Sequence, residues 1–196
     1  MSYNIVMPKI VNHEERKALI AKATWNVIAR DGLGGASVRS IAKEANLSLG
    51  AVRHYFNTQE ELLEFAMQLV EEQATDRIME HAKESLPPKT ITLNMLMELI
   101  PPENRVVEMQ VWLEYISYKL RKKELKEDSV HQGIVLIMNR LNDAGLLKAE
   151  VNLEEEIIHL HALIDGIALH LLMGFVTIGR DRIRALIERE LDRIFT

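Results

Sequence analysis

One short segment of the sequence carries side chains that suit the reading of DNA bases. In residues 48–56, SLGAVRHYF, the small residues Gly50 and Ala51 stand close to Arg53 and His54. A helix whose exposed residues are small can enter a major groove, where one arginine can donate two hydrogen bonds to guanine O6 and N7. The segment therefore predicts a helix that contacts DNA, with Arg53 as the base-reading residue.

A second short helix must hold this one in position. The apolar residues just before it follow the i, i+3, i+4, i+7 spacing of one helix face: Val38, Ile41, Ala42 and Ala45. Ser37 and Ser48 stand where each helix begins, and a serine hydroxyl there can accept a hydrogen bond from a free backbone N–H. The spacing predicts a helix-turn-helix over about residues 37–56. An ordinary αα-hairpin of a helical bundle has the same spacing, so spacing alone leaves both readings open.

The residues around this helix pair resemble the TetR family of bacterial repressors from about Glu14 to Ala74. The matching positions are Ala23, Ile28, Gly32, Ser37, Val38, Ile41, Ala42, Ala45, Ser48, Gly50, His54, Tyr55, Phe56 and residues 57–63. The resemblance implies an all-α fold with an N-terminal helix-turn-helix DNA-binding domain over residues 1–58. It also implies a larger helical domain over residues 59–196 for ligand binding and dimerisation.

Two positions depart from the family pattern. This chain has Arg53 where the family usually has tyrosine, and Gln59 where the family usually has lysine. The first change alters a base or phosphate contact, and the second removes a phosphate contact. An operator sequence therefore cannot be transferred from a relative.

The expected DNA contacts lie on the second helix and at the helix starts around it: Ser37, Arg39, Ser48, Leu49, Gly50, Ala51, Arg53, His54, Tyr55 and Thr58. Five of them, Arg39, Ser48, His54, Tyr55 and Thr58, are expected to bind phosphate, which positions a protein without reading sequence. The chain has a net charge of −5, yet residues 1–57 hold eight Lys or Arg and four Asp or Glu, a net charge of +4. Residues 58–196 therefore carry a net charge of −9. The positive charge is concentrated at the N-terminal end, which is expected to attract a polyanion.

The composition narrows the class of protein. The 196 residues include no cysteine, which excludes disulfides, thiol catalysis and cysteine-ligated metals. The N-terminal segment lacks the basic stretch and long apolar run of a secretory signal. The most apolar later stretch, residues 160–176, contains His161, Asp165 and His170 and makes a poor membrane span. We expect a cytoplasmic protein with no membrane contact.

Almost the whole chain reads as helix, and strand patterns are absent. The apolar periods, prolines and glycines predict further helices at about residues 13–30, 59–84, 92–99, 103–123, 129–144, 153–177 and 181–195. The helix over residues 59–84 is expected to join the two domains.

The helix over residues 153–177 is apolar on nearly every side, so it must be covered on more than one face. One face can pack within its own protomer and another against a second copy of the chain. The expected contacts of a homodimer are Ile164, Ala168, Leu172, Phe175, Ile183, Ile187 and Leu191. The resemblance implies a four-helix interface built from two helices of each protomer. A monomer with one deeply buried helix is the alternative.

A set of adaptable and aromatic side chains predicts a pocket for a small-molecule effector: Met95, Met109, Trp112, Tyr115, Met138, His161 and Asp165. Methionine packs adaptably and Trp or Tyr offers a polar tip, which suits an apolar or cationic ligand. The same residues also suit plain core. His161 and Asp165 lie four residues apart, but a metal site needs a third ligand, and His159 points from another face. We therefore expect no metal and no cofactor.

Further resemblance to the BetI-type subgroup lies in residues 104–114 and 161–166, although it does not identify the ligand. Three classes of function remain. The first is a transcriptional repressor, a homodimer on a palindromic DNA operator that a small molecule releases. The second is a DNA-binding module without an inducer, either architectural or controlled by a protein partner. The third, a small helical enzyme, lacks a nucleophile–base pair, a phosphate loop and a metal cluster in the sequence, so we expect no catalytic residues.

Overall fold

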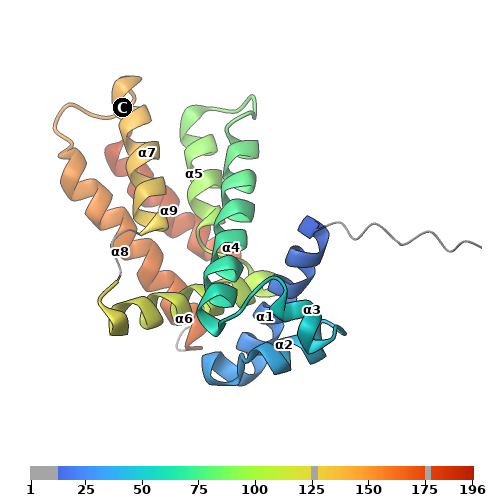
Figure 1. Ribbon diagram of the computed structural model, residues 1–196. Helices are drawn as coiled ribbons and strands as arrows, with labels where there is room; N and C mark the ends of the chain where they lie inside the picture. The colour runs from blue at the N-terminus through green and yellow to red at the C-terminus, as the bar shows by residue number, and fades with distance from the viewer. Residues whose placement is uncertain (1–12, 125–127, 175–177) are drawn as a thin grey trace, which may run out of the picture. The chain divides into compact units, whose positions relative to one another are not determined.

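The computed structural model describes residues 13–124, 128–174 and 178–196, and most of them are helical (Figure 1). The helices are α1 (His13–Gly35), α2 (Val38–Glu44), α3 (Leu49–Arg53), α4 (Gln59–His81), α5 (Pro88–Glu98), the 3₁₀ turn η1 (Glu103–Arg105), α6 (Val106–Lys122), α7 (Ser129–Asp143), α8 (Leu153–Leu172) and α9 (Arg180–Ile194). Within these residues the β-structure is one isolated bridge, between Leu147 and Phe195. The all-α prediction is confirmed.

The chain forms two compact units, residues 1–69 (unit 1) and residues 70–196 (unit 2). The sequence places the boundary after residue 58, whereas the first turns of α4 contribute to unit 1. Leu62 and Leu63 are almost fully buried there, and Trp25 of α1 donates a hydrogen bond of 2.9 Å from Nε1 to the carbonyl of Ala66. These turns complete the core of unit 1.

One glycine conformation and two serine caps determine where the helices of unit 1 bend or begin. Gly32 has φ +68°, a left-handed conformation that breaks the helical path of α1. Ser37 and Ser40 form a reciprocal capping box at the start of α2, and Ser48 caps α3 by accepting a hydrogen bond of 3.1 Å from the Ala51 N–H. The two expected serine caps are confirmed.

Unit 2 has one apolar core to which α5, α7, α8 and α9 contribute. In Figure 1, α5 lies along α9, and α7 lies along α8. Fully buried members of this core are Leu96, Ile100, Ile134, Met138, Leu160, Ile164 and Ile187. Arg180 of α9 donates from Nη2 to the carbonyl of Met97 at 2.6 Å and from Nη1 to the carbonyl of Ile100, which satisfies carbonyls at the end of α5.

Two helix boundaries differ from the sequence prediction. Helix α5 begins at Pro88 rather than near residue 92, because proline is tolerated in the first turn, where its missing N–H has no partner to lose. Helix α8 ends at Leu172, and Gly174 has φ +67° just beyond it. No helix in the described ranges has the length and apolar character needed to cross a membrane.

Candidate nucleic-acid interface and effector region

Helix α3 presents one buried and one exposed face, as the sequence predicts. Val52 is fully buried, whereas Gly50 and Arg53 are exposed, and Leu49 and Ala51 keep part of their surface. A Cβ added at Gly50 meets no atom within 4 Å, so open space surrounds this face. The exposed face therefore combines small residues with one exposed guanidinium.

The hydroxyls expected to bind phosphate already act as helix caps. Ser48 accepts from the Ala51 N–H, and Thr58 accepts from the Glu61 N–H at 3.1 Å. An accepting hydroxyl keeps its own hydrogen, so both can still donate to phosphate. The Ser37 hydroxyl also lies 3.0 Å from the Ser40 hydroxyl, which uses its own hydrogen to donate to the Gly35 carbonyl. The Ser37 hydroxyl therefore accepts within the capping box and donates to Ser40, so its hydrogen is already in use.

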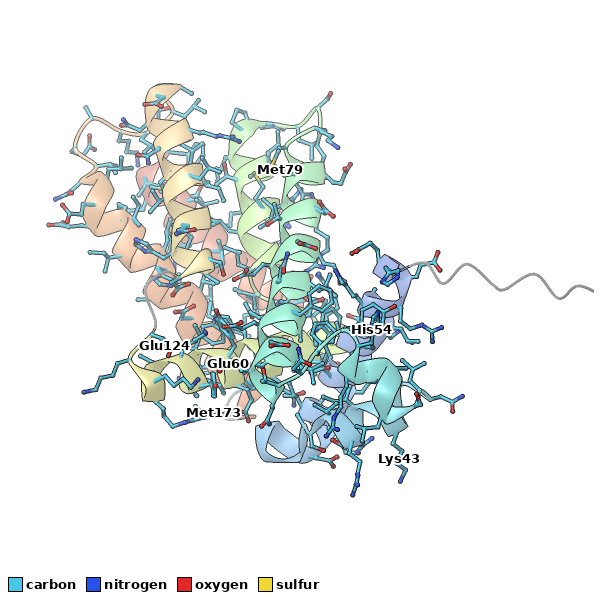
Figure 2. All side chains as sticks on the ribbon, in the orientation of Figure 1. Lys43, His54, Glu60, Met79, Glu124 and Met173 are labelled. Atoms are coloured by element: carbon cyan, nitrogen blue, oxygen red, sulfur yellow. The ribbon has the colours of Figure 1, made fainter. Side chains whose placement is uncertain are left out.

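The cations of unit 1 are not equivalent. Arg30 forms ion pairs with Asp31 at 3.0 Å and Glu44 at 2.9 Å, and its hydrogen bond lowers the pKa of Glu44. Arg39 and Arg53 are exposed, as is Lys43 on the last turn of α2. Figure 2 shows the Lys43 side chain extending away from its helix.

Lys43 is missing from the residues predicted from the sequence. Its position one turn after Arg39 was the available signal, because residues four apart lie on the same helix face. The two side chains place two positive charges on α2, the helix that packs against α3.

His54 and Tyr55 belong to an aromatic cluster with the start of α1. The ring of His13 lies 6.1 Å from that of His54 and 5.4 Å from that of Tyr55. His54 remains exposed, whereas Tyr55 is half-buried and also lies 6.5 Å from the ring of Phe56. Both residues thus help to fix the end of α3, in addition to any contact with phosphate.

Most of the predicted dimer contacts are buried within a single protomer, and the dimer interface itself stays a prediction. A side chain that one protomer buries completely has no surface left for a second copy. The residues buried in the protomer's own core are Ile164, Ala168, Ile183, Ile187 and Leu191. Phe175 lies outside the described residues. Leu172 remains partly exposed on α8, next to Met173, which is 50% exposed.

The predicted pocket residues fall into three groups. Met95 and Met138 form the first group and belong to the apolar core of unit 2. Met109, Trp112 and Tyr115 lie on α6, where the indole Nε1 of Trp112 is buried without a hydrogen-bond partner in the described structure. His161 and Asp165 form the third group, together with Asp128.

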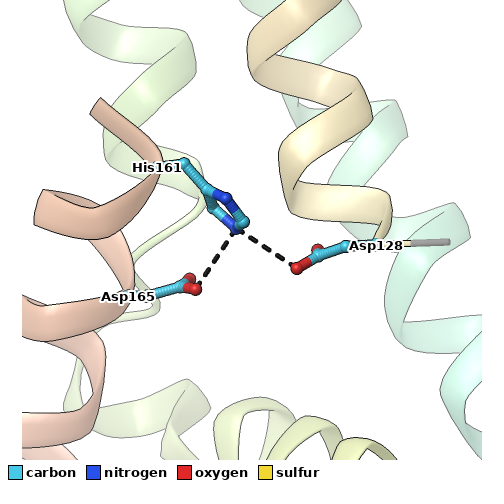
Figure 3. Close-up of side chains that lie close together, drawn as sticks. All are labelled: Asp128, His161 and Asp165. Carbon is cyan, nitrogen blue, oxygen red and sulfur yellow. Dashed lines mark ion pairs between the residues drawn. The ribbon is translucent and has the colours of Figure 1, made fainter. Parts of the chain in front are cut away.

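Figure 3 shows the cluster of Asp128, His161 and Asp165, which spans the start of α7 and the middle of α8. The His161 Nε2 atom lies 3.2 Å from Oδ2 of Asp128 and 3.2 Å from Oδ2 of Asp165. Burial raises the pKa of Asp165 against the opposing effect of His161, and the Asp128 carboxylate raises it further. Two carboxylates and one imidazole thus share a small, partly exposed space.

Sequence reasoning paired His161 with Asp165 but missed Asp128. The only signal was that Asp128 stands just before Ser129, where a helix begins. Its Oδ1 atom accepts hydrogen bonds from the N–H groups of Val130 at 3.0 Å and His131 at 3.3 Å. This capping role holds the carboxylate at the end of α7 that faces α8.

A surface groove of about 470 Å³ adjoins this cluster along α7 and α8. Its lining residues are His131, Val135, Leu153, Glu154, Ile157 and Ile158. The ring of His131 lies 5.1 Å from that of His161. The groove is therefore next to the Asp128–His161–Asp165 cluster, separated from it by one imidazole.

A network of charged side chains joins α4, α5 and α6 within unit 2. Arg77 donates to Glu98 and to Glu108, each at 2.8 Å, and Arg105 donates to Glu98 at 2.8 Å. Burial alone would raise the pKa of Glu98, but the hydrogen bonds and charges of Arg105 and Arg77 hold it below its usual range. The network fixes the last turns of α4 against α6.

Comparison with known proteins agrees with both parts of this description. The family of bacterial regulatory proteins named tetR matches residues 20–66, which include α2 and α3. The C-terminal part of BetI-type transcriptional repressors matches residues 90–196.

Individual relatives match along nearly the whole chain. The HTH-type transcriptional regulator PksA of Bacillus subtilis is 44% identical over 96% of this chain and 94% of its own length. The HTH-type transcriptional regulator BetI of Vibrio parahaemolyticus is 33% identical over 97% of both chains. A putative transcriptional regulator from Saccharomonospora viridis, solved in complex with choline, has the same fold, with a TM-score of 0.75 at 21% identity over 93% of this chain and 99% of its own. The chain therefore belongs to the TetR family of bacterial transcriptional regulators, and its C-terminal part is of the BetI type.

Proposed function

We propose that two copies of this chain bind an inverted-repeat DNA operator and that a small molecule bound in unit 2 releases them. As a TetR-family protein the chain is a transcriptional regulator and not an enzyme; the homodimer, the operator contacts and the effector are what the proposal adds. The observation that carries the proposal is the exposed face of α3 with Gly50 and Arg53, a helix that packs against α2 and its exposed cations Arg39 and Lys43.

In the proposed complex, α3 enters the major groove and Arg53 reads a base. Gly50 and Ala51 allow the close approach, and Arg39 and Lys43 on one face of α2 bind phosphate. The capping hydroxyls of Ser48 and Thr58 donate their free hydrogens to phosphate. Because the operator is chromosomal DNA, we expect the protein to act in the bacterial cytoplasm.

A dimer is proposed because one short helix reads only a few base pairs. Two recognition helices reach successive major grooves when they lie about 34–36 Å apart. The partly exposed end of α8, with Leu169, Leu172 and Met173, is the surface we assign to the second copy. These side chains alternate with Ile167 and Leu171, which pack against the core of unit 2.

The effector part of the proposal rests on Trp112. A buried donor without an acceptor costs about 1–3 kcal/mol, and a ligand that offers an acceptor removes this cost. The choline complex of the Saccharomonospora viridis regulator provides a precedent for a small ligand in this fold. We assign the effector to the α6 region around Trp112 and Tyr115.

The DNA part is tested with duplexes from the DNA that flanks the gene. An inverted repeat found there and a scrambled duplex are titrated at one fixed salt concentration, because phosphate contacts make affinity salt-dependent. We expect the repeat to bind at least about 10³-fold more tightly. Equal affinities would refute operator recognition.

The effector part is tested separately. A thermal-shift screen identifies small molecules that raise the melting temperature of the DNA-free protein by mass action. Each such molecule is then added to the protein–operator complex, and we expect at least one to release the DNA. If every binder leaves the complex intact, the alternative of a DNA-binding module without an inducer replaces this part of the proposal.

A further inference from the structure

We propose that Asp128, His161 and Asp165 bind a divalent transition-metal cation such as Zn²⁺ between α7 and α8. Each residue offers one ligand atom, and the three atoms lie within 4.8 Å of one another. Figure 3 shows both carboxylates turned toward the same imidazole nitrogen. This site lies outside the DNA-binding unit and is independent of the proposed operator.

The separations of the ligand atoms match those around a bound ion. Zinc bonds to histidine nitrogen and carboxylate oxygen are about 2.0–2.2 Å long, which puts adjacent ligand atoms about 3.0–3.5 Å apart. The His161 Nε2 atom lies 3.2 Å from each carboxylate oxygen. In the tetrahedral geometry that zinc prefers, every pair of ligand atoms is adjacent, so the two carboxylate oxygens must also come to about 3.5 Å from each other. The two carboxylates, no more than 4.8 Å apart, therefore need only small side-chain rotations.

Among the residues that the structure describes, the nitrogen that faces both carboxylates has no hydrogen-bond partner. His161 Nε2 is buried, and neither carboxylate contact has hydrogen-bond geometry. Buried polar atoms of native proteins are normally satisfied, so an orphaned nitrogen calls for a missing partner. A metal ion supplies that partner, because neutral imidazole donates its lone pair to the ion.

The protein holds the two carboxylates in place before an ion arrives. Asp128 uses Oδ1 to cap α7, which leaves Oδ2 directed toward His161. Asp165 lies one turn after His161 on α8, so both side chains project from the same face. Ligands from the two helices are therefore already arranged around one point.

A nearby histidine provides a contrast. His159 lies 3.7 Å from Glu156 and 4.0 Å from Glu190, but Arg193 donates to Glu156 at 2.8 Å and lies 3.0 Å from the His159 ring. An arginine thus balances the carboxylates of that group. At the Asp128–His161–Asp165 cluster, His161 is the ion-pair partner of both carboxylates in the described structure.

The ligand types select the class of ion. Imidazole nitrogen favours zinc, nickel, copper or iron, whereas magnesium and calcium prefer oxygen ligands alone. Two carboxylates carry the charge that a divalent cation neutralises. The side chains of the three ligands are 21–29% exposed, so water can reach the site and complete the coordination shell.

The test uses the full-length, untagged protein after treatment with EDTA and dialysis. Zn²⁺ is titrated by calorimetry, and Co²⁺ by its visible absorption, which reports nitrogen and oxygen ligands. We expect one ion per chain, a rise in melting temperature with Zn²⁺, and no displacement by excess Mg²⁺. Absence of saturable binding by either ion would overturn the proposal and leave His161 as a bridge between two carboxylates.

Matched variants assign the site. Asp128→Asn keeps the helix cap, since asparagine caps as well as aspartate, but removes the anionic ligand. We expect Asp128→Asn and His161→Gln each to weaken Zn²⁺ binding by at least about tenfold, and His159→Gln to bind as the wild type does. Unchanged affinity in both ligand variants would show that the ion binds elsewhere and would overturn the assignment. None of these metal-binding measurements involves DNA, so the test of the metal site remains valid even if the operator proposal fails.

Discussion

Arg77 of α4 donates a 2.8 Å hydrogen bond to Glu108 of α6, a carboxylate that is only 6% exposed. The same guanidinium donates to Glu98 of α5, which also accepts from Arg105. One arginine therefore connects three helices of unit 2. A displacement of α6 must either carry the last turns of α4 with it or break a buried ion pair.

Replacing Arg77 with alanine leaves two mostly buried carboxylates short of a cation. We expect Arg77→Ala to lower the free energy of unfolding by about 3–5 kcal/mol, because an uncompensated buried charge is costly. Urea denaturation followed by circular dichroism measures the loss. Lys83→Ala removes an exposed pair with Glu80 and should change stability by less than about 1 kcal/mol. Similar small losses in both variants would mean that the Arg77 network contributes little.

The network also predicts a pH dependence. The pKa of Glu98 is lowered in the folded protein, so its ionised form stabilises the fold above the unfolded pKa of about 4.3. That stabilisation is lost as the pH falls through the lowered folded-state pKa. We expect Glu98→Gln to be less stable than the wild type at neutral pH and equally stable at strongly acidic pH. The exposed Glu188→Gln is the control, and a pH-independent difference for Glu98→Gln would contradict the assignment.

The sequence predicts the helices well because apolar spacing, serine caps and glycines act within a few residues. The caps at Ser37 and Ser48 are local features of this kind. The cluster at His161 is different, because Asp128 lies more than thirty residues away and joins it only when α7 packs on α8. The periodicity of α8 likewise shows that Ile164 is covered, but not whether its own protomer or a second copy covers it.

Base and phosphate contacts on unit 1 should respond differently to mutation. Arg53→Ala should cost about 1–3 kcal/mol on the operator and reduce discrimination against altered bases. Lys43→Ala should weaken binding to all sequences alike. It should also reduce the slope of log affinity against log salt concentration by about one. Fluorescence anisotropy over a range of salt concentrations distinguishes the two, with the exposed Arg189→Ala of α9 as the control. If Arg53→Ala weakened all duplexes equally, Arg53 would be a phosphate contact.

The surface at the end of α8 makes a prediction about assembly. Leu172→Glu places a charge where we assign the second copy, and burying an unpaired carboxylate there costs several kcal/mol. We expect this variant to be a folded monomer by light scattering and to lose operator affinity. Leu120→Glu, at a position of α6 that is 57% exposed, should remain a dimer. A monomeric wild type with full operator affinity would refute the dimer.

The last prediction separates an effector contact from ordinary core at Trp112. Phenylalanine retains most of the apolar volume of the indole but removes the unsatisfied Nε1 donor. Without an effector, Trp112→Phe should therefore fold with a melting temperature equal to or above that of the wild type and bind the operator normally. If the effector accepts a hydrogen bond from Nε1, the variant should need at least about tenfold more effector to release the DNA, because a lost hydrogen bond costs about 1.5 kcal/mol. Tyr118→Phe on the same helix is a matched control that removes a hydroxyl instead. Unchanged release by Trp112→Phe would place Trp112 in the core and the effector elsewhere in unit 2.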